Sequence, residues 1–365
     1  MPAVAYVTTV VASRPALARS AWLEGLRHRP VALAVVGLAL LLCVLVAGVA
    51  LGSVAIAPAD TLAILAHRLL GWPVEVTWPA SAETIVLELR LPRVLMAMAV
   101  GLGLSLAGVT LQGLLRNPLA DPYVLGTASG AALGAAIALL VPIQFALLGF
   151  GLVHVLAFAG ALLAVTAVYR VSRLGALNSL TSVLLTGYAI GSLLAAGLAI
   201  TMYLAGTNLR QIFFYLLGSF SLASWPQVAV GLPLIVLASL VLLSRARALN
   251  GLLLGEEMAA HLGLNVRRER VILLAAASLV TAAAVAMSGL IGFVGLVVPH
   301  LVRLVTGPNA RTLLPLSAIY GAAFLGLADL IARMPGELPV GVITGVIGAP
   351  FFLYVLRRYR GGYEL

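Results

Sequence analysis

The sequence predicts an all-α fold: a polytopic membrane protein with about ten transmembrane helices, in a single domain over residues 1–365. Two observations support this prediction. The chain is 62% hydrophobic and only 9% charged, whereas an average soluble domain is about 25% charged. Its charged residues also fall between uncharged runs, several of which reach the roughly 20 residues that a membrane-spanning helix needs. Because 9% charged residues are too few to form a water-facing surface, most of the chain must lie in a lipid bilayer.

The uncharged runs place the spans in order. An N-terminal segment at 1–29 comes first. The run at 122–169 would be roughly 72 Å long as one helix, more than two bilayer cores. It must therefore fold back, and Pro142 near its middle is the expected turn. The other expected spans are 30–59, 94–115, 182–204, 227–243, 271–288, 291–305, 313–330 and 340–356.

The arginines predict the orientation. All 22 cationic residues are arginine. With the N-terminus in the cytoplasm, 17 of them lie inside, and the C-terminus is also cytoplasmic. This agrees with the positive-inside rule, and it explains the net charge of +10 without a nucleic-acid partner. The five arginines left outside are Arg68, Arg90, Arg93, Arg210 and Arg333.

Several chemistries find no support in the sequence. Without lysine there is no phosphate-binding P-loop, so we expect no ATPase activity and no enzyme in this chain. The single cysteine, Cys43, excludes an internal disulfide. No Cys, His and carboxylate cluster has metal-ligand spacing, so neither a metal site nor a stably bound cofactor is expected.

Small residues recur within the spans, as in "GLGLSLAG" (101–108) and "TGYAIGSLLAAG" (186–197). Small residues let helix backbones approach closely in lipid, where no hydrophobic drive brings helices together. We therefore expect a tightly packed bundle. The polar and small residues of the 182–204 span could instead line a pore, and periodicity does not separate the two interpretations.

The stretch "LLRNPLADPYVLG" (114–126) predicts a tight cytoplasmic connection between two spans. Pro118 cannot continue a helix and pushes Asn117 toward an extended conformation. Asp121 is placed to cap the next helix, with Pro122 at the first helical position.

This stretch and six further motifs resemble the membrane permeases of type II ABC importers for iron–siderophores, haem and cobalamin. The resemblance covers nearly the whole chain. The other motifs are "LRLPR" (89–93), "GSFSLASW" (218–225), "GEEMAAHLGL" (255–264), "GLIGFVGLVVPHLVR" (289–303), "LADLIAR" (327–333) and "ELPVGVITGVIGAPFFLYVLRR" (337–358).

The resemblance implies a homodimer of ten-helix subunits in the cytoplasmic membrane of a prokaryote, with a path along the dimer axis. Two separate ATPase subunits would sit below it and use ATP, and a substrate-binding protein would dock above. The implied cargo is an iron–siderophore or haem, with cobalamin as the alternative.

The resemblance also assigns roles to residues. The cytoplasmic loop at 244–270 would contain a short coupling helix that docks on the ATPase. The residues that match this pattern are Gly255, Glu256, Ala259, Leu262 and Gly263. Without the resemblance, the loop would be interpreted as a solvated amphipathic linker.

Three outer arginines, Arg90, Arg93 and Arg333, match positions that pair with glutamates of the binding protein. A guanidinium holds a carboxylate in a bidentate fork, which fixes orientation as well as attraction. The alternative is that these arginines only snorkel to the membrane interface.

Two further assignments are open. An inner gate is expected at Ser179, Leu180, Thr181 and Ser182, where an ordinary helix N-cap is an equally good interpretation. His154 and His300 lie near or within spans, where an ionisable residue indicates function by default, and either could contact haem. A histidine beside Pro299 is also typical of a helix start.

Two other classes of membrane protein are alternatives to the importer. An ion-coupled secondary transporter needs buried carboxylates near the middle of the membrane. The acids here are expected in loops or at span ends, with Asp329 closest to an exception. An intramembrane enzyme needs paired catalytic side chains inside the bundle, and the sequence shows no such pair.

Overall fold

The computed structural model describes residues 29–358, apart from positions 53, 144–145, 148–149, 175–179 and 335. Within these residues the chain is helical almost throughout, and its one sheet is a short hairpin of β1 (Ala146–Leu147) and β2 (Phe150–Gly151). Most of the predicted segment 1–29 lies outside the described residues, as does Ser179.

The prediction of about ten spanning helices is confirmed. Eight helices of the described chain are long and apolar enough to cross a membrane, and two shorter apolar helices, α6 and α14, complete the set. The chain is therefore a multi-pass membrane protein. In order, the ten are α2 (Pro30–Ala50), the continuous helix Ala80–Leu114, α6 (Thr127–Leu140), α7 (Leu152–Leu174), α8 (Leu180–Leu204), α10 (Trp225–Ser244), α13 (Val266–Ser288), α14 (Val294–Thr306), α15 (Ala310–Arg333) and α16 (Val340–Arg358).

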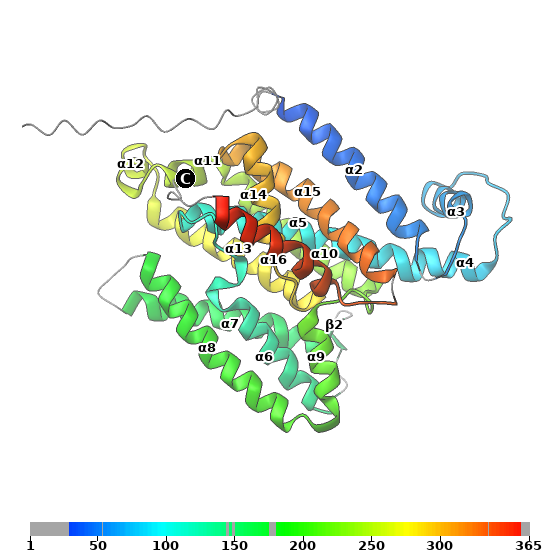
Figure 1. Cartoon of the computed structure of the whole chain (residues 1–365), viewed down its shortest axis with the longest axis horizontal. Coiled ribbons are helices and arrows are strands. Elements are labelled where there is room, and N and C mark those ends of the chain that lie inside the picture. The colour runs from blue at the N-terminus through cyan, green and yellow to red at the C-terminus, as the bar shows by residue number, and fades with distance from the viewer. Residues whose placement is uncertain are drawn as a thin grey trace, which may run out of the picture.

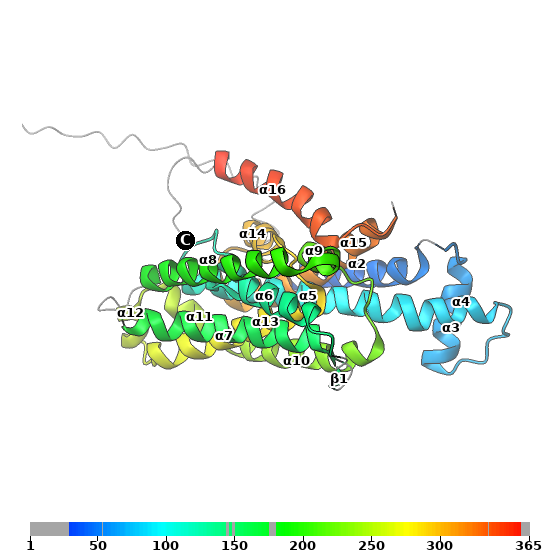
Figure 2. The same cartoon turned by 90° about the horizontal axis from the view of Figure 1, so that it is seen from below.

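Helix α5 (Leu91–Leu114) is the centre of the bundle, and nearly all of its residues are buried. Helices α2, α10, α13, α14 and α15 pack around it, while α6, α7 and α8 form a second group beside them (Figure 1). Seen from the second direction, α16 lies at the edge of the molecule (Figure 2). The turn expected at Pro142 is present, since α6 ends at Leu140 and α7 begins at Leu152.

The start of the second span differs from the prediction. The sequence placed "LRLPR" before the helix, but α4 (Ala80–Thr84), a π-helical segment η1 (Ile85–Arg90) and α5 form one continuous helix. The π turn explains how the helix passes through Pro92. Proline lacks an N–H and its ring collides with the carbonyl four residues earlier. In the wider π turn the N–H of Leu91 bonds to the carbonyl of Val86, five residues back. The carbonyls of this turn are thereby shifted away from the ring of Pro92.

The small residues of the spans bring helix backbones together, as predicted. A Cβ added to Gly108 of α5 would lie 1.9 Å from the carbonyl oxygen of Gly295 in α14, and one added to Gly134 of α6 would lie 2.0 Å from that of Leu156 in α7. Helix α8, in contrast, lies at the periphery: Tyr203, for example, is 88% exposed.

Short helices connect the spans. One of them, α12 (Glu256–His261), lies in the 244–270 loop, where the resemblance implied a short helix. The others were not expected from the sequence: α3 (Pro58–Leu70), the 3-10 turns η2 (Pro122–Leu125) and η3 (Gly206–Asn208), α9 (Leu209–Leu217) and α11 (Ala246–Leu253). Helix α3 ends at Gly71, whose φ of 67° is the left-handed conformation that favours glycine at a helix end.

Candidate functional site

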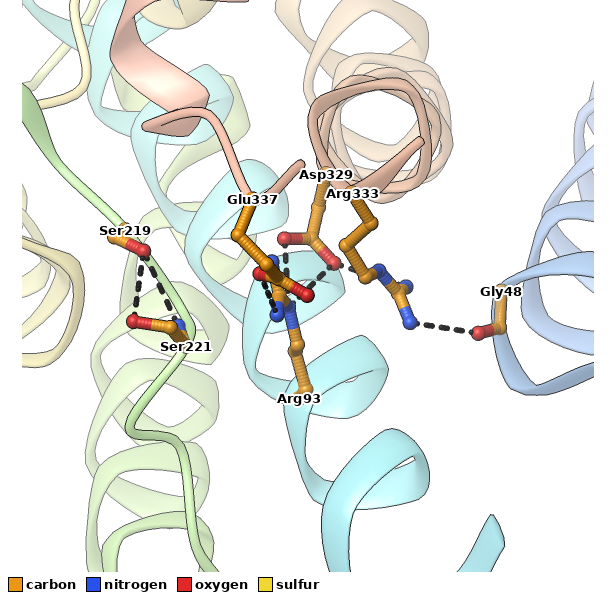
Figure 3. Close-up of polar contacts among 7 residues, drawn as sticks. All are labelled: Gly48, Arg93, Ser219, Ser221, Asp329, Arg333 and Glu337. Atoms are coloured by element: carbon orange, nitrogen blue, oxygen red, sulfur yellow. Dashed lines mark hydrogen bonds and ion pairs between the residues drawn. The ribbon is translucent and has the colours of Figure 1, made fainter. Parts of the chain in front are cut away.

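Four charged side chains meet where α5 and α15 approach each other, and we call Arg93, Asp329, Arg333 and Glu337 the outer cluster (Figure 3). Nε of Arg93 lies 3.0 Å from Oδ1 of Asp329, and its Nη1 lies 2.7 Å from Oε2 of Glu337. Nη2 of Arg333 lies 2.9 Å from Oδ2 of Asp329, one helical turn away. Asp329 therefore pairs with two guanidiniums at once.

The neighbouring Arg90 closes the end of α2. Its Nη1 donates to the carbonyls of Val49 at 3.1 Å and Ala50 at 2.7 Å, and its Nη2 donates to the carbonyl of Val54. Arg333 adds a bond of 3.0 Å from Nη1 to the carbonyl of Gly48. The last carbonyls of a helix have no partner within it, and cations stabilise that negative end. Two guanidiniums therefore cap the C-terminus of α2.

The three outer arginines are all buried in the structure. Arg90 is 6% exposed, Arg93 is 7% and Arg333 is 3%. They are buried because carboxylates and helix-end carbonyls of the same chain accept hydrogen bonds from them. Their guanidiniums therefore neither extend to the membrane interface nor lie fully exposed to solvent. Their docking to a binding protein stays a prediction, and it must now account for Glu337, whose side chain is 45% exposed at the edge of the cluster.

The "GSFSLASW" motif lies beside the outer cluster. Ser219 and Ser221 form a small polar turn, with their hydroxyl oxygens 3.2 Å apart, next to Glu337 in Figure 3. The backbone N–H of Ser219 donates to the carbonyl of Ser288 at 2.8 Å. This turn is thereby joined to the end of α13.

On the opposite side, the 114–126 connection forms the cap that the sequence predicts. Oδ1 of Asp121 accepts from the N–H of Tyr123 at 2.8 Å, with Pro122 at the first position of the turn η2. Burial raises the pKa of the Asp121 carboxyl above its ordinary value. Arg116 donates from Nη2 to the carbonyl of Leu252 at 3.1 Å, so this connection also contacts α11.

Tyr123 links this connection to the break between α13 and α14. Its hydroxyl donates to the carbonyl of Ile291 at 2.9 Å and accepts from the N–H of the same residue at 3.2 Å. The break needs this support because Gly289 and Phe293 both have positive φ, of 70° and 69°. No local pattern in the sequence indicates this contact, because the two residues are far apart in the chain.

The 244–270 loop contains the short helix that the resemblance implied, α12. Gly255 precedes it with φ 115° and Gly263 follows it with φ 81°. Ala259 is fully buried, whereas Leu262 is 61% exposed. Glu256 pairs with Arg270 on α13, so the short helix is tied to the start of a membrane helix.

A groove of about 670 Å³ lies beside α12. Leu254, Leu262 and Leu264 form part of its wall, with Arg303 and Asn309 from the neighbouring helices. Exposed apolar side chains at a groove are typical of a surface that binds another protein. The loop therefore has the shape of a docking element, while its partner stays a prediction.

The comparisons with known proteins identify the family. The model of the FecCD transport family matches residues 39–358. The chain belongs to the FecCD transport family. The cobalamin import permease BtuC of Halobacterium salinarum is 46% identical over 82% of this chain and 79% of its own length. The haemin transport permease HmuU of Yersinia pestis is 43% identical over 76% of this chain and 84% of its own.

A solved structure agrees with this assignment. An inward-facing conformation of a metal-chelate type ABC transporter has a TM-score of 0.75 with this chain and 30% sequence identity. The match covers 93% of this chain and 99% of that chain. The FecCD fold therefore extends over nearly the whole sequence, as the motifs predicted.

The remaining predicted site residues that the structure describes lie at the start of α8, on α7 and on α14. Leu180 and Thr181 begin α8, and Ser182 makes a long bond of 3.5 Å from Oγ to the carbonyl of Ser172. His154 lies 3.2 Å from the amide nitrogen of Gln227, and His300 packs edge-on against Phe351. Both histidines have protein neighbours, and contact with cargo stays a prediction. The described residues contain no group of three or more His, Cys, Asp or Glu able to hold a metal ion.

Proposed function

We propose that this chain is the permease subunit of an ATP-driven importer that moves a metal chelate into the cytoplasm. The observation that carries the proposal is the match over nearly all of the chain to a metal-chelate type ABC transporter. Relatives named for haemin and for cobalamin support the same class of cargo. An iron–siderophore or haem is our first choice, and cobalamin is the alternative.

The assembly that we propose has two copies of this chain, two ATPase subunits and one extracytoplasmic binding protein. It lies in the cytoplasmic membrane of a prokaryote, with both termini in the cytoplasm. ATP would be bound and hydrolysed only by the ATPase subunits. The α12 helix would seat on an ATPase, because the exposed Leu262 that follows it lies at a groove and Glu256 ties it to α13.

The structure also bears on the ion-coupled alternative. Two carboxylates, Asp329 and Glu269, are buried among the described residues. Asp329 lies one turn from the end of α15, and Glu269 lies in the first turn of α13, 2.9 Å from Arg245. Both are paired with arginine near a helix end, rather than poised at mid-membrane to carry a proton or sodium ion.

Transport in proteoliposomes tests the proposal. The complex is reconstituted with ATPase and binding protein from the same gene cluster and offered a ferric siderophore, haemin and cobalamin in turn. We expect uptake of one class that requires ATP and the binding protein. Uptake driven by a proton or sodium gradient without ATP would contradict the proposal, as would ATP hydrolysis by this chain purified free of its partners.

A further inference from the structure

The two carboxylates of the outer cluster differ in exposure and in the number of their partners. Asp329 is fully buried and pairs with both Arg93 and Arg333. Glu337 is 45% exposed, and in the described part of the chain its ion pair is with Arg93 alone, at 2.7 Å. Figure 3 shows it approaching Arg93 from the loop between α15 and α16. Glu337 is therefore the member of the outer cluster that can leave without unpacking a helix.

The backbone that carries Glu337 is unusual. Its φ is 63°, in the left-handed region that is unfavourable for a residue with a Cβ, and Gly336 before it has φ 101°. The N–H of Leu338 donates to the carbonyl of Ala332 at 2.9 Å, which turns the chain back toward α15. This strained turn places the carboxylate over the guanidinium of Arg93. Non-glycine residues in such conformations are concentrated at binding and switch sites.

The cluster still has capacity for another anion. Arg93 and Arg333 balance the two negative charges of Asp329 and Glu337, and the neighbouring Arg90 adds a third positive charge beside the cluster. Among the described residues, Nη2 of Arg93 and Nε of Arg333 have no hydrogen-bond acceptor. A buried guanidinium with unused donors is stabilised by any carboxylate that reaches it.

We propose that Glu337 is an internal occupant of the carboxylate site on Arg93, and that it lowers the affinity of the permease for the binding protein by competing with an acidic side chain of that partner. The inference rests on the proposed function, since it needs a partner that docks on this face. A glutamate or aspartate from outside would present the same group that Glu337 presents. It would have to displace Glu337, or share Arg93 against the repulsion of a second negative charge.

The test compares affinities for the binding protein encoded in the same gene cluster. The permease and its ATPase subunits are held in nanodiscs, and the dissociation constant is measured by surface plasmon resonance. Glu337→Gln keeps the volume and removes the charge. We expect it to bind about two- to fivefold more tightly, the range that corresponds to one partly exposed ion pair.

Three further variants make the result specific. Glu337→Gly relieves the left-handed backbone as well as removing the carboxylate, so it should also bind more tightly without loss of folding. In the double variant Arg93→Gln with Glu337→Gln the gain should vanish. Glu83→Gln is the matched control, because Glu83 is another outer carboxylate, paired with Arg68 at 2.5 Å, and its loss should leave the affinity unchanged.

The outcomes separate the inference from the proposed function. Unchanged or weaker binding by both Glu337 variants, with normal binding by the wild type, would overturn the inference alone. Failure of the wild-type complex itself to bind the binding protein would overturn the proposed assembly, and the inference with it.

Discussion

Arg93 and Asp329 lie 236 positions apart in the sequence, yet Nε of Arg93 donates to Oδ1 of Asp329 at 3.0 Å in the buried part of the outer cluster. This contact joins α5 to α15 by an ion pair as well as by apolar packing. Asp329 is also shared with Arg333. Neither arginine can lose this carboxylate without becoming a buried cation with too few acceptors, so the triad holds the two helices in one register.

We therefore expect Asp329→Asn to destabilise the protein strongly. Asparagine keeps the volume but leaves two guanidiniums without their shared charge, and breaking a buried pair from one side costs about 3–5 kcal/mol. Thermal unfolding of the purified protein in detergent should show a large drop in midpoint. Glu75→Gln, a change at an exposed outer carboxylate, should leave the midpoint within error, and an equally stable Asp329→Asn variant would contradict this role.

The close approach of α5 and α14 gives a second prediction. Gly108→Ala would place a Cβ 1.9 Å from the carbonyl oxygen of Gly295, so the two helices must separate, and overpacking of this kind typically costs about 1–3 kcal/mol. Gly345→Ala in α16 is the matched control, because nothing lies within 4 Å of its added Cβ. The control should be neutral or slightly stabilising, since alanine is favoured over glycine in a helix. The measurements are the yield of folded protein and the unfolding temperature of Gly108→Ala and Gly345→Ala. Equal values for the two variants would contradict the close approach of α5 and α14.

The sequence predicts the helical architecture well because each span must satisfy its backbone within itself and present an apolar surface to lipid. Both constraints act on local stretches, so charge-free runs and prolines such as Pro142 reveal the order of the helices. The cap at Asp121 is equally local, and it was predicted for the same reason.

The outer cluster could be predicted only in part. The i, i+4 spacing of Asp329 and Arg333 is a local signal that predicts an ion pair between them, and the structure contains that pair. The contact between Arg93 and Glu337 joins distant segments through a strained turn, and no pattern around either residue indicates it. Arg90 is the last residue of the π turn before Pro92, and helix propensities do not predict such a turn.

Tyr123 provides a third prediction. Tyr123→Phe removes a hydroxyl that both donates to and accepts from Ile291, and leaving buried backbone groups unsatisfied costs about 1–3 kcal/mol. We expect a lower unfolding temperature and slower transport, because the break between α13 and α14 loses its support. Tyr203→Phe, at an exposed tyrosine of α8, should change neither quantity. Wild-type behaviour of Tyr123→Phe would show that the hydroxyl is replaced by water.

Helix α12 gives a fourth prediction, which rests on backbone conformation. Gly255 has φ 115° and Gly263 has φ 81°, so a valine at either position is strained by roughly 1–3 kcal/mol whatever space surrounds it. We expect Gly255→Val and Gly263→Val to insert and fold in the membrane but to bind the ATPase subunits poorly, or to permit hydrolysis without transport. Co-purification of the ATPase and coupled transport are the measurements. Glu257→Ala, at an exposed residue of the same helix, is the control, and normal coupling in the valine variants would make the loop a passive linker.

The final prediction separates a structural role of Arg90 from a docking role. Arg90 donates to three carbonyls at the end of α2, and losing a cap of this kind costs about 1–2 kcal/mol. Arg90→Gln should therefore lower the unfolding temperature whether or not the binding protein is present. Arg90→Lys should rescue little, because an ammonium cannot reproduce the planar fork that reaches several carbonyls. If Arg90 acted mainly in docking, its variants would keep the wild-type unfolding temperature and lose affinity for the binding protein, with a loss that depends on salt. The structure favours the first outcome, because the contacts of Arg90 all lie inside the chain and only 6% of the residue is exposed.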